Sequence, residues 1–490
     1  MSRSKTSSVI KTQILQNINL CSQIHKTHKT NILDKLIVHN QDLAQQGSPE
    51  WLAIRAYNIG GSEMSTITGD NCFSSIDKLV AQKIGFSQFS GNIATRWGKL
   101  FEFVTQQITE IVFDIDDGIQ ETGSLEGAIP NQRYSPDGLA IIKMKCEDVV
   151  NKQKIETDEY CIVLFEFKSP LYSIPAGYIP KYYLPQVKTG MCSIPITDFA
   201  IFISNMFRKC AFNELGTSKE YDTEFHNRDS KHKFNPVPPL AFGMILFYQT
   251  ENQQLQFYEK YKNLITYDPN KNEFNYDSDD SDDAEDAFNS MNHMNNNKET
   301  TPEIKPVFVP TYSENVSLYK YIHRSCTEQN DNIRDIGKSY YRDFNDILQL
   351  FDDGLLSVKY CVPHILEEYN HNEFLVAQGK THGTDDCEQT IKDYQHIINS
   401  GVVGTGEPIV GYLPWKMVKS DIIYEPRDEM YVLNHEDKIK EVIKTIQKIN
   451  TAPTQEDKVT MFKKYYPKSK VLKESGLDNT HVMEFLPQNM

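Results

Sequence analysis

The sequence predicts an α/β fold with a mixed β-sheet, because two kinds of segment recur along the chain. Short apolar runs rich in β-branched and aromatic residues occur at 162–165, 199–203 and 242–248, and such runs are typical of buried strands. Segments with apolar residues at helical spacing occur at 94–108 and 439–449. We therefore expect strands and helices to share a core, and the length suggests roughly two to four domains.

Composition and segment lengths indicate a soluble intracellular protein. Hydrophobic residues make up 39% of the chain and charged residues 24%, which is ordinary for a globular protein. The polar N-terminus has no apolar signal-peptide core, and the most apolar run, 240–247, is too short to cross a bilayer. The nine cysteines include no C-x-x-C pair, which argues against zinc ribbons and iron–sulfur clusters. We expect no membrane partner.

The net charge of −16 is unusual for a protein that binds nucleic acid, since such proteins carry a basic surface. The charge is, however, unevenly distributed. Seven acids fall within ten residues at 277–286, whereas bases outnumber acids between 168 and 209. The bases there are Lys168, Lys181, Lys188, Arg208 and Lys209. We therefore expect a locally positive site in an acidic protein, so the charge weakens a DNA-binding hypothesis without excluding it.

Composition shifts divide the chain into five segments. Residues 1–45 are expected to form an N-terminal arm with a weak helical period, and 46–267 the main core. Residues 268–306 are rich in Asn, Asp, Ser and Met, and we expect a disordered acidic insertion because so polar a stretch buries too little apolar surface to fold. We expect 307–450 to be mostly helical and to return to the core with a final strand and helix, and 451–490 to form a tail.

The strand expected at 160–167 ends in two charges that share one face. Side chains two apart in a strand point the same way, so Glu166 and Lys168 emerge together from an apolar strand. Burying charge is costly unless the charge is paired or binds a metal, and an ordinary salt-bridged strand end also satisfies that condition. Upstream, a Ser-Pro-Asp-Gly turn places Asp137 before an apolar run, and 139–165 is expected to form a β-hairpin.

Asp137 followed by Glu166-Phe-Lys168 resembles the PD-(D/E)XK nuclease signature. This short signature becomes more specific when the rest of the chain shows further motifs in the order that such nucleases use.

A glycine-rich stretch after a short expected helix is the second motif. Trp51, Arg55 and the run Gly60-Gly-Ser62-Glu63 place backbone N–H groups at a helix start, where they favour an anion such as a phosphate. An ordinary glycine-rich helix entry is the alternative. The stretch resembles the N-terminal motif of the YqaJ-like viral recombinase family, which is related to phage lambda exonuclease. The resemblance implies that Arg55 and Ser62, seven residues apart, hold the 5′-phosphate of DNA.

Two helical motifs complete the resemblance. Gly98-Lys-Leu-Phe-Glu102 lies in the helix expected at 94–108, and it matches a family helix that supplies an acid to the site. Tyr183-Leu-Pro-Gln186 opens a later helix and matches the family's Y-x-x-Q, whose Gln lies near the metal and whose Tyr contacts DNA. Solvated positions on amphipathic helices would explain these residues equally well when each is taken alone.

The resemblance covers roughly residues 48–210 and implies a restriction-endonuclease-like core. It implies a Mg²⁺ cofactor, for which Mn²⁺ can substitute. Asp137 and Glu166 would hold the metal together with the Phe167 carbonyl, and Glu102 would contribute directly, through water or through a second metal.

Two further residues are expected to take part in hydrolysis. Lys168 would orient the attacking water or offset charge in the transition state. Gln186 would hold the nucleophile or position Lys168. The catalytic set implied by the resemblance is therefore Glu102, Asp137, Glu166, Lys168 and Gln186.

The family degrades double-stranded DNA from 5′ ends to feed recombination or repair. The resemblance thus implies double-stranded DNA and a single-strand annealing protein as partners, and a homo-oligomer, a trimer in the family. Members occur in phages and large DNA viruses, which would place the protein in the host cytoplasm or at a viral replication site. A structure-specific endonuclease and a catalytically idle DNA-binding scaffold are the alternatives. The intact acids and Lys168 argue against the scaffold, whereas Arg55 and Ser62 argue for end-directed cutting.

Overall fold

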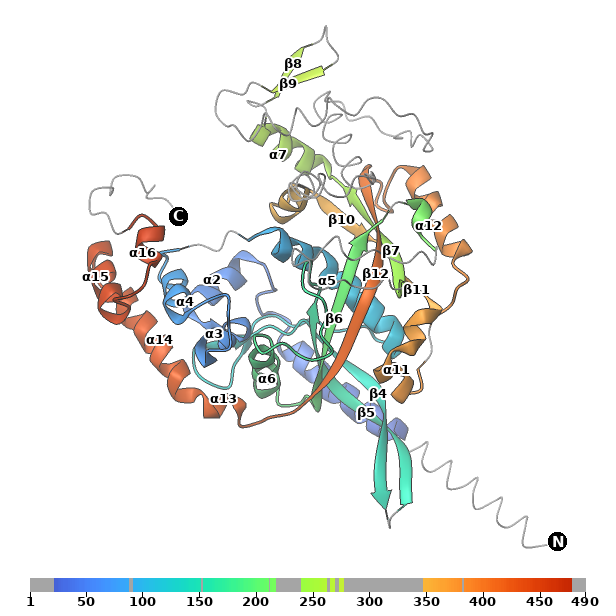
Figure 1. Ribbon diagram of the computed structural model, residues 1–490, viewed down its shortest axis with the longest axis horizontal. Coiled ribbons are helices and arrows are strands. Elements are labelled where there is room, and N and C mark those ends of the chain that lie inside the picture. The colour runs from blue at the N-terminus through green and yellow to red at the C-terminus, as the bar shows by residue number, and fades with distance from the viewer. Residues whose placement is uncertain are drawn as a thin grey trace, which may run out of the picture.

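The computed structural model describes residues 22–87, 91–150, 153–210, 212–216, 239–261, 265–268, 273–276, 347–380 and 383–477 (Figure 1). Helices pack around one large mixed sheet, so the predicted α/β class is confirmed. The acidic run at 277–286, and with it most of the segment expected to be an insertion, lies outside the described residues. Within the described ranges no helix is long and apolar enough to span a bilayer.

The large sheet has seven strands in the order β10-β7-β12-β6-β5-β4, with β11 beside β7. Its strands are β4 (Gly138–Val150), β5 (Gln153–Lys168), β6 (Phe199–Lys209), β7 (Ala241–Tyr248), β10 (Ser357–Tyr360), β11 (His364–Ile365) and β12 (Ile409–Pro426). β5 and β6 pair in parallel, whereas β4 pairs with β5 in antiparallel fashion. The predicted hairpin is therefore present, and it extends beyond the body of the sheet (Figure 1).

The last strand in sequence lies in the middle of the sheet. β12 pairs with β6 over 415–426 and with β7 over 409–417, so it joins two parts of the sheet that are otherwise separate. β12 is the final strand that the sequence predicts within 307–450. Buried backbone N–H and C=O groups need hydrogen-bond partners, and β12 finds them in β6 along one edge and in β7 along the other.

Helices cover both faces of the sheet. α5 (Ile93–Phe113) packs on one face, where its apolar stripe joins Phe165, Phe207 and Trp415 in the largest buried cluster. The ring centroids of Phe101 and Phe207 lie 4.6 Å apart at the centre of this contact. α6 (Leu184–Ser193) and a helix over 22–39 contribute to the cluster on the other face, which includes Leu164 of β5. Alternate residues of β5 thus face different helical layers, as a period of two requires.

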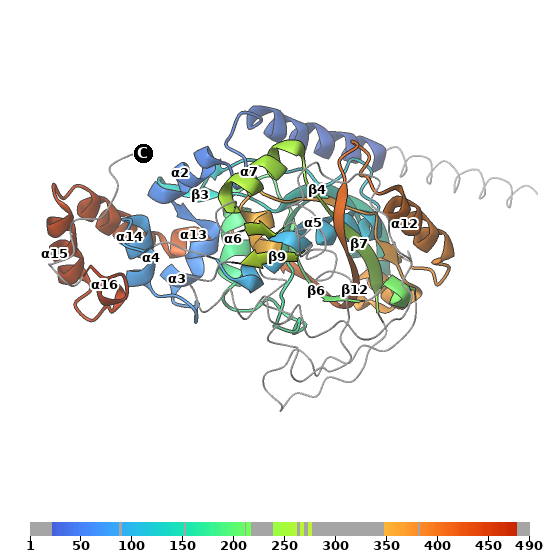
Figure 2. The ribbon, with the colours of Figure 1, turned by 90° about the horizontal axis from the view of Figure 1, so that it is seen from above.

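A helical lobe lies beside the sheet and combines segments from 49–83 with the last described part of the chain (Figures 1 and 2). It contains α2 (Pro49–Tyr57), α3 (Met64–Thr68), α4 (Ile76–Lys83), α13 (Tyr431–Asn434), α14 (Glu436–Asn450), α15 (Gln455–Tyr465) and α16 (Val471–Glu474). The apolar residues of 439–449 form the buried stripe of α14, which packs against α3 and α4. A small sheet of β1 (Ile59–Gly60), β3 (Gln132–Tyr134) and β2 (Leu125–Glu126) adjoins the lobe.

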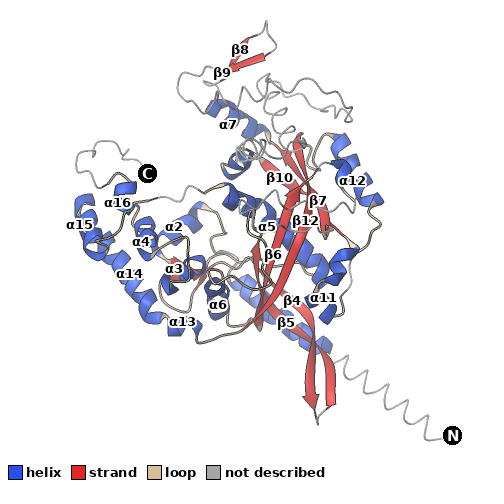
Figure 3. Ribbon diagram, in the orientation of Figure 1, coloured by secondary structure: helices blue, strands red, loops and turns tan. Residues whose placement is uncertain are grey.

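The remaining elements differ in part from the expectations (Figure 3). They are η1 (Gly61–Glu63), η2 (Phe212–Glu214), η4 (Glu367–His371), α7 (Glu251–Tyr261), α11 (Glu373–Ala377), α12 (Glu388–Ser400), β8 (Ile265–Asp268) and β9 (Glu273–Tyr276). The region expected to be mostly helical also contributes β10 and β11, which complete the sheet beside β7. The expected tail carries α15 and α16, because Phe462, Val471 and Leu472 supply apolar surface to the helical lobe. The expected arm includes the helix over 22–39, whose Leu33 is buried.

Candidate active site

The end of β5 carries a fully buried carboxylate, that of Glu166. Glu166 has no exposed surface, and its Oε1 accepts a hydrogen bond from Lys168 Nζ. The Lys168 side chain is 19% exposed, so it links this buried carboxylate to the protein surface. Burial lowers the pKa of Lys168, but the Glu166 and Asp137 carboxylates outweigh burial and hold that pKa well above its ordinary value. The predicted pair is therefore an ion pair at the end of β5.

The hairpin register brings Asp137 to the same point. Gly138 is the partner of Phe165, so the residue before β4 lies beside the residues that end β5. Asp137 Oδ2 accepts a hydrogen bond of 2.8 Å from the Phe167 N–H and lies 3.6 Å from Lys168 Nζ. Its side chain is only 8% exposed. Two carboxylates thus share one ammonium group.

Glu102 lies on α5, the helix that packs on the opposite face of the sheet from α6. Burial, with Asp137 and Glu166 adding to it, raises the pKa of Glu102 to about 8, although Lys168 opposes the shift. α5 is fixed to the strand tip because Ser169 Oγ lies 3.0 Å from Thr105 Oγ1 and donates to the Phe101 carbonyl at 3.3 Å. The structure therefore brings Glu102 into the electrostatic field of the other two acids.

Three carboxyl groups lie around the one ammonium group of the site. Burial, with Asp137 adding to it, raises the pKa of Glu166 to about 7, although Lys168 and Tyr134 oppose the shift. Burial is the main cause of both raised pKa values and the neighbouring carboxylates add to them, so a further positive charge would favour the ionised acids. A bound divalent cation would supply that charge.

Tyr134 is a site residue that the motifs did not reveal. Its hydroxyl donates to Glu166 Oε2 at 3.1 Å, and the residue is 2% exposed. Burial, together with Glu166 and Asp137, raises its pKa well above the ordinary value, so the hydroxyl keeps its proton and remains a donor. The sequence signal was weak, because a tyrosine three residues before an aspartate indicates no partner 32 residues further on.

Two glycines make room for the Tyr134 ring. A Cβ added at Gly61 would lie 2.4 Å from Tyr134 Cδ2, and one added at Gly190 would lie 2.4 Å from Tyr134 Cζ. The ring therefore passes between η1, which carries Ser62, and α6, which carries Gln186. The second glycine of the Gly-Gly-Ser motif thus permits a close contact with the residue that holds Glu166.

Arg55 and Ser62, which the sequence predicts to bind a phosphate, are in direct contact with each other. Arg55 Nη2 donates to Ser62 Oγ at 2.9 Å, and the guanidinium lies 5.0 Å from the centroid of the Trp51 ring. Trp51 Nε1 in turn donates to Ser135 Oγ at 2.9 Å, which ties α2 to the turn that carries Asp137. Two motifs 84 residues apart therefore form one structure.

A buried lysine supports this pair, and sequence reasoning missed it. Lys83 Nζ donates to the Arg55 carbonyl at 2.6 Å and to the Asn58 carbonyl at 2.7 Å, and it pairs with Glu63 Oε1 at 2.8 Å. Its side chain is 5% exposed. Glu63 Oε2 also accepts from the Gly60 N–H at 2.8 Å, so Lys83 and Glu63 fix the backbone on both sides of the pair.

The Y-x-x-Q residues lie on the side of Lys168 that faces α6. Lys168 Nζ lies 5.3 Å from the centroid of the Tyr183 ring. Gln186 follows one turn later on α6 and is half-buried. The expected roles of Tyr183 in contacting DNA and of Gln186 in holding the nucleophile or positioning Lys168 stay predictions.

The expected basic cluster is largely occupied by structural contacts. Lys188 pairs with Glu425 and Asp428, at 3.5 and 3.3 Å. Arg208 is buried and donates to the Leu171 and Phe207 carbonyls. Lys181 is exposed, as a DNA-binding residue requires. The local positive charge at the site therefore comes chiefly from Lys168 and Arg55 rather than from a continuous basic stripe.

The donor set fits a hard divalent cation. Within the described residues no three His, Cys, Asp or Glu side chains are arranged as a closed metal cage. Mg²⁺, however, is commonly bound through one or two carboxylates, with water and substrate oxygens completing its shell. Asp137 and Glu166 would provide those carboxylates, and the Phe167 carbonyl and Glu102 lie nearby as further oxygen donors.

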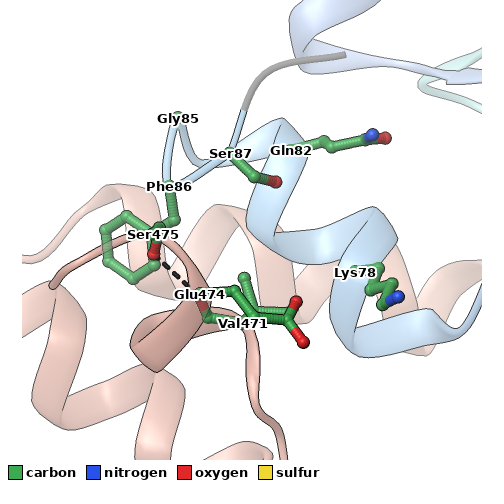
Figure 4. A pocket seen from close by; sticks show the side chains of 8 residues that line it. All are labelled: Lys78, Gln82, Gly85, Phe86, Ser87, Val471, Glu474 and Ser475. Atoms are coloured by element: carbon green, nitrogen blue, oxygen red, sulfur yellow. Dashed lines mark hydrogen bonds between the residues drawn. The ribbon is translucent and has the colours of Figure 1, made fainter. Parts of the chain in front are cut away.

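A cavity elsewhere has no connection with this site. It measures about 460 Å³ and lies between α4 and α16, lined by Lys78, Gln82, Gly85, Phe86, Ser87, Val471, Glu474 and Ser475 (Figure 4). It contains none of the predicted site residues.

Among known proteins, this chain has relatives in a large DNA virus. No protein-family model matches the chain. It is 30% identical over 222 residues to a protein of African swine fever virus, strain Badajoz, a stretch that is 43% of this chain and 62% of the viral protein. The same viral protein from a Malawi tick isolate is 31% identical over 222 residues. The chain thus spans under two thirds of the length of these viral relatives.

Among solved structures, the chain is similar to the alkaline exonuclease LHK-Exo of Laribacter hongkongensis. The likeness has a TM-score of 0.24 and 19% identity, and it covers 32% of this chain and 74% of that one. LHK-Exo in complex with dAMP is similar at 20% identity and the same TM-score. The chain resembles the YqaJ-like, lambda-type exonuclease family.

Proposed function

We propose that this chain is a metal-dependent deoxyribonuclease that hydrolyses double-stranded DNA from its 5′ ends. One observation carries the proposal. Asp137, just before β4, lies within ion-pair distance of Lys168, which is hydrogen-bonded to Glu166 at the end of β5. Glu102 from α5 lies close enough for these groups to affect its pKa. Surplus acids around one fixed ammonium suit phosphodiester hydrolysis, which needs charge neutralisation and an activated water.

The cofactor we propose is Mg²⁺, for which Mn²⁺ would substitute. Asp137 and Glu166 would hold it with the Phe167 carbonyl, and Glu102 would contribute directly or through water. When bound, such an ion supplies Lewis-acid stabilisation of the phosphate and lowers the pKa of a water molecule. The protein keeps the ligands in place through Tyr134, which donates to Glu166, and through the Phe167 N–H, which donates to Asp137.

Lys168 is the proposed group for orienting water or offsetting transition-state charge. Its ammonium contacts both carboxylates, so its position is fixed before substrate arrives. Its raised pKa keeps it charged at neutral pH, which suits electrostatic stabilisation rather than proton abstraction. Gln186, one turn beyond Tyr183, would hold the nucleophile or position Lys168.

End-directed cutting is supported by Arg55 and Ser62. The Arg55 side chain is 41% exposed and Ser62 is exposed, so a terminal phosphate can reach both donors. Guanidinium groups bind phosphate with two parallel hydrogen bonds, and here the support from Lys83 and Glu63 keeps the pair in place. A recombination or repair role, an annealing partner and a homo-oligomer would follow from the same family resemblance.

One assay tests the proposal directly. Linear duplex DNA with and without 5′-phosphates, and closed circular duplex, are incubated with Mg²⁺ and either wild type or Lys168→Met. We expect the wild type to degrade linear DNA, faster with 5′-phosphates, and the variant to be inactive. Nicked circles would instead support the structure-specific endonuclease, whereas equal behaviour of the two proteins would support the idle scaffold.

A further inference from the structure

Three polar side chains meet inside the largest apolar cluster, close to the end of β5. Thr105 on α5, Ser169 just after β5 and Asn205 on β6 are each at most 5% exposed. We call these three residues the polar brace. The residues two, four and six positions before Ser169, and those two or four positions from Asn205, are apolar members of the same cluster: Val163, Phe165, Phe167, Ile201, Ile203 and Phe207. Burying polar groups costs stability unless they are hydrogen-bonded, so the three depend on one another.

The hydrogen bonds of the polar brace run in one direction and end on the backbone of α5. Asn205 Nδ2 donates to Thr105 Oγ1 at 3.5 Å, and Thr105 Oγ1 lies 3.0 Å from Ser169 Oγ. Ser169 Oγ donates to the Phe101 carbonyl at 3.3 Å. Since a hydroxyl has one proton to donate, Thr105 is the donor in the bond between the two hydroxyls. The series therefore ends at the residue that precedes Glu102.

Each member of the polar brace lies next to an element of the candidate active site. Ser169 follows Lys168, and Thr105 lies about one turn after Glu102 on α5. Asn205 follows the register partner of Lys168 on β6. Because successive strand side chains point to opposite faces, Lys168 lies against Tyr183 of the α6 layer, whereas Ser169 reaches α5.

Glu102 depends on such a link more than the other two acids do. Asp137 and Glu166 are placed by the register of the hairpin between β4 and β5. Glu102 instead comes from a helix that meets the sheet mainly through apolar side chains. Apolar contacts are non-directional, whereas hydrogen bonds fix both distance and angle. Only directional contacts of this kind can hold α5 at one setting against the end of β5.

We propose that the polar brace is a positioning device that sets the place of Glu102 relative to Lys168. This inference rests on the proposed nuclease function and adds Thr105 and Ser169 to it as positioning residues. Both are buried behind the site, so they act through Glu102 and Lys168 rather than on DNA or metal.

The test compares variants that remove or keep one hydroxyl. Mg²⁺ binding is measured by calorimetry without DNA, and kcat and KM are measured on 5′-phosphorylated linear duplex. Thr105→Val and Ser169→Ala should each weaken Mg²⁺ binding and lower kcat, about tenfold in each case. KM should stay unchanged, because the phosphate-binding pair proposed above, Arg55 and Ser62, lies on α2 and η1. Thr105→Ser keeps the hydroxyl and should restore wild-type values.

Thr109→Val is the matched control. Thr109 is equally buried on α5, and its hydroxyl donates to the Thr105 carbonyl at 2.7 Å, within the helix. This variant should lose as much stability in urea unfolding as Thr105→Val, yet keep wild-type Mg²⁺ binding and kcat. The double variant Thr105→Val/Ser169→Ala should be no worse than either single variant, because all three break the same link.

The inference is wrong if Thr105→Val and Ser169→Ala bind Mg²⁺ and cut DNA as Thr109→Val does, since the brace would then contribute stability alone. Losses that multiply in the double variant would also overturn it, because the two hydroxyls would then act separately. A wild type that neither binds Mg²⁺ nor cuts DNA would refute the proposed nuclease, and this inference with it. The two failures are therefore distinguished by the wild type.

Discussion

Tyr134→Phe is the substitution that best isolates how the fold supports the site. It keeps the ring that passes between Gly61 and Gly190 and removes only the hydroxyl, which donates to Glu166 Oε2 at 3.1 Å. Glu166 has no exposed surface, so water cannot replace the lost donor. The carboxylate then depends on Lys168 alone.

The expected loss follows from the charge and burial of the acceptor. A hydrogen bond to a charged group contributes about 1.5–3 kcal/mol, so we expect the unfolding free energy to fall by about 2 kcal/mol. Because Tyr134 orients a proposed metal ligand, its loss should also reduce nuclease activity or metal affinity about 10- to 100-fold. Thermal melting measures the first effect, and a Mg²⁺ titration of DNA hydrolysis measures the second.

Tyr369→Phe provides the control. Tyr369 is equally buried, and its hydroxyl lies 3.0 Å from Ser420 Oγ, a neutral partner outside the site. This variant should lose about 1 kcal/mol of stability and keep full activity and metal affinity. If Tyr134→Phe is no less stable than Tyr369→Phe and binds Mg²⁺ like wild type, the hydroxyl does not hold Glu166 and the reasoning is wrong.

Three further substitutions test other parts of the site. Gly190→Ala should destabilise the protein by about 1–3 kcal/mol in urea unfolding, because its Cβ would lie 2.4 Å from the Tyr134 ring; an unchanged midpoint would contradict this close packing. Lys83→Met should cost about 3 kcal/mol or more, since it leaves the Glu63 carboxylate without its buried partner, and should abolish the preference for 5′-phosphorylated ends. Mg²⁺ should raise the melting temperature of wild type but not of Asp137→Asn, and an equal rise in both would remove Asp137 from the ligand set.

Local patterns in the sequence were enough to predict the chemistry of the strand tip. A period of two places Glu166 and Lys168 on the same face of β5, and the turn before β4 places Asp137 at the start of the hairpin. Each of these features depends on residues within a few positions of one another. The apolar stripes of α5 and α14 were readable for the same reason.

Contacts between residues far apart in the sequence could not be predicted from such local patterns. Tyr134 reaches Glu166 across 32 residues, Lys83 reaches the Arg55 carbonyl across 28, and Phe73 meets Tyr182 although they lie on different elements. No sequence pattern marks these residues as contact partners, because each contact depends on how whole helices and strands pack against one another.

The sequence by itself therefore determined which side chains share a face, and hence that Glu166 and Lys168 emerge together at the end of β5. Only the tertiary structure decided that β12 lies between β6 and β7, and that Tyr134 connects the glycine-rich motif to Glu166. The physical reason is that backbone geometry fixes periodicity residue by residue, whereas register and neighbours between distant segments depend on burying many apolar side chains at once.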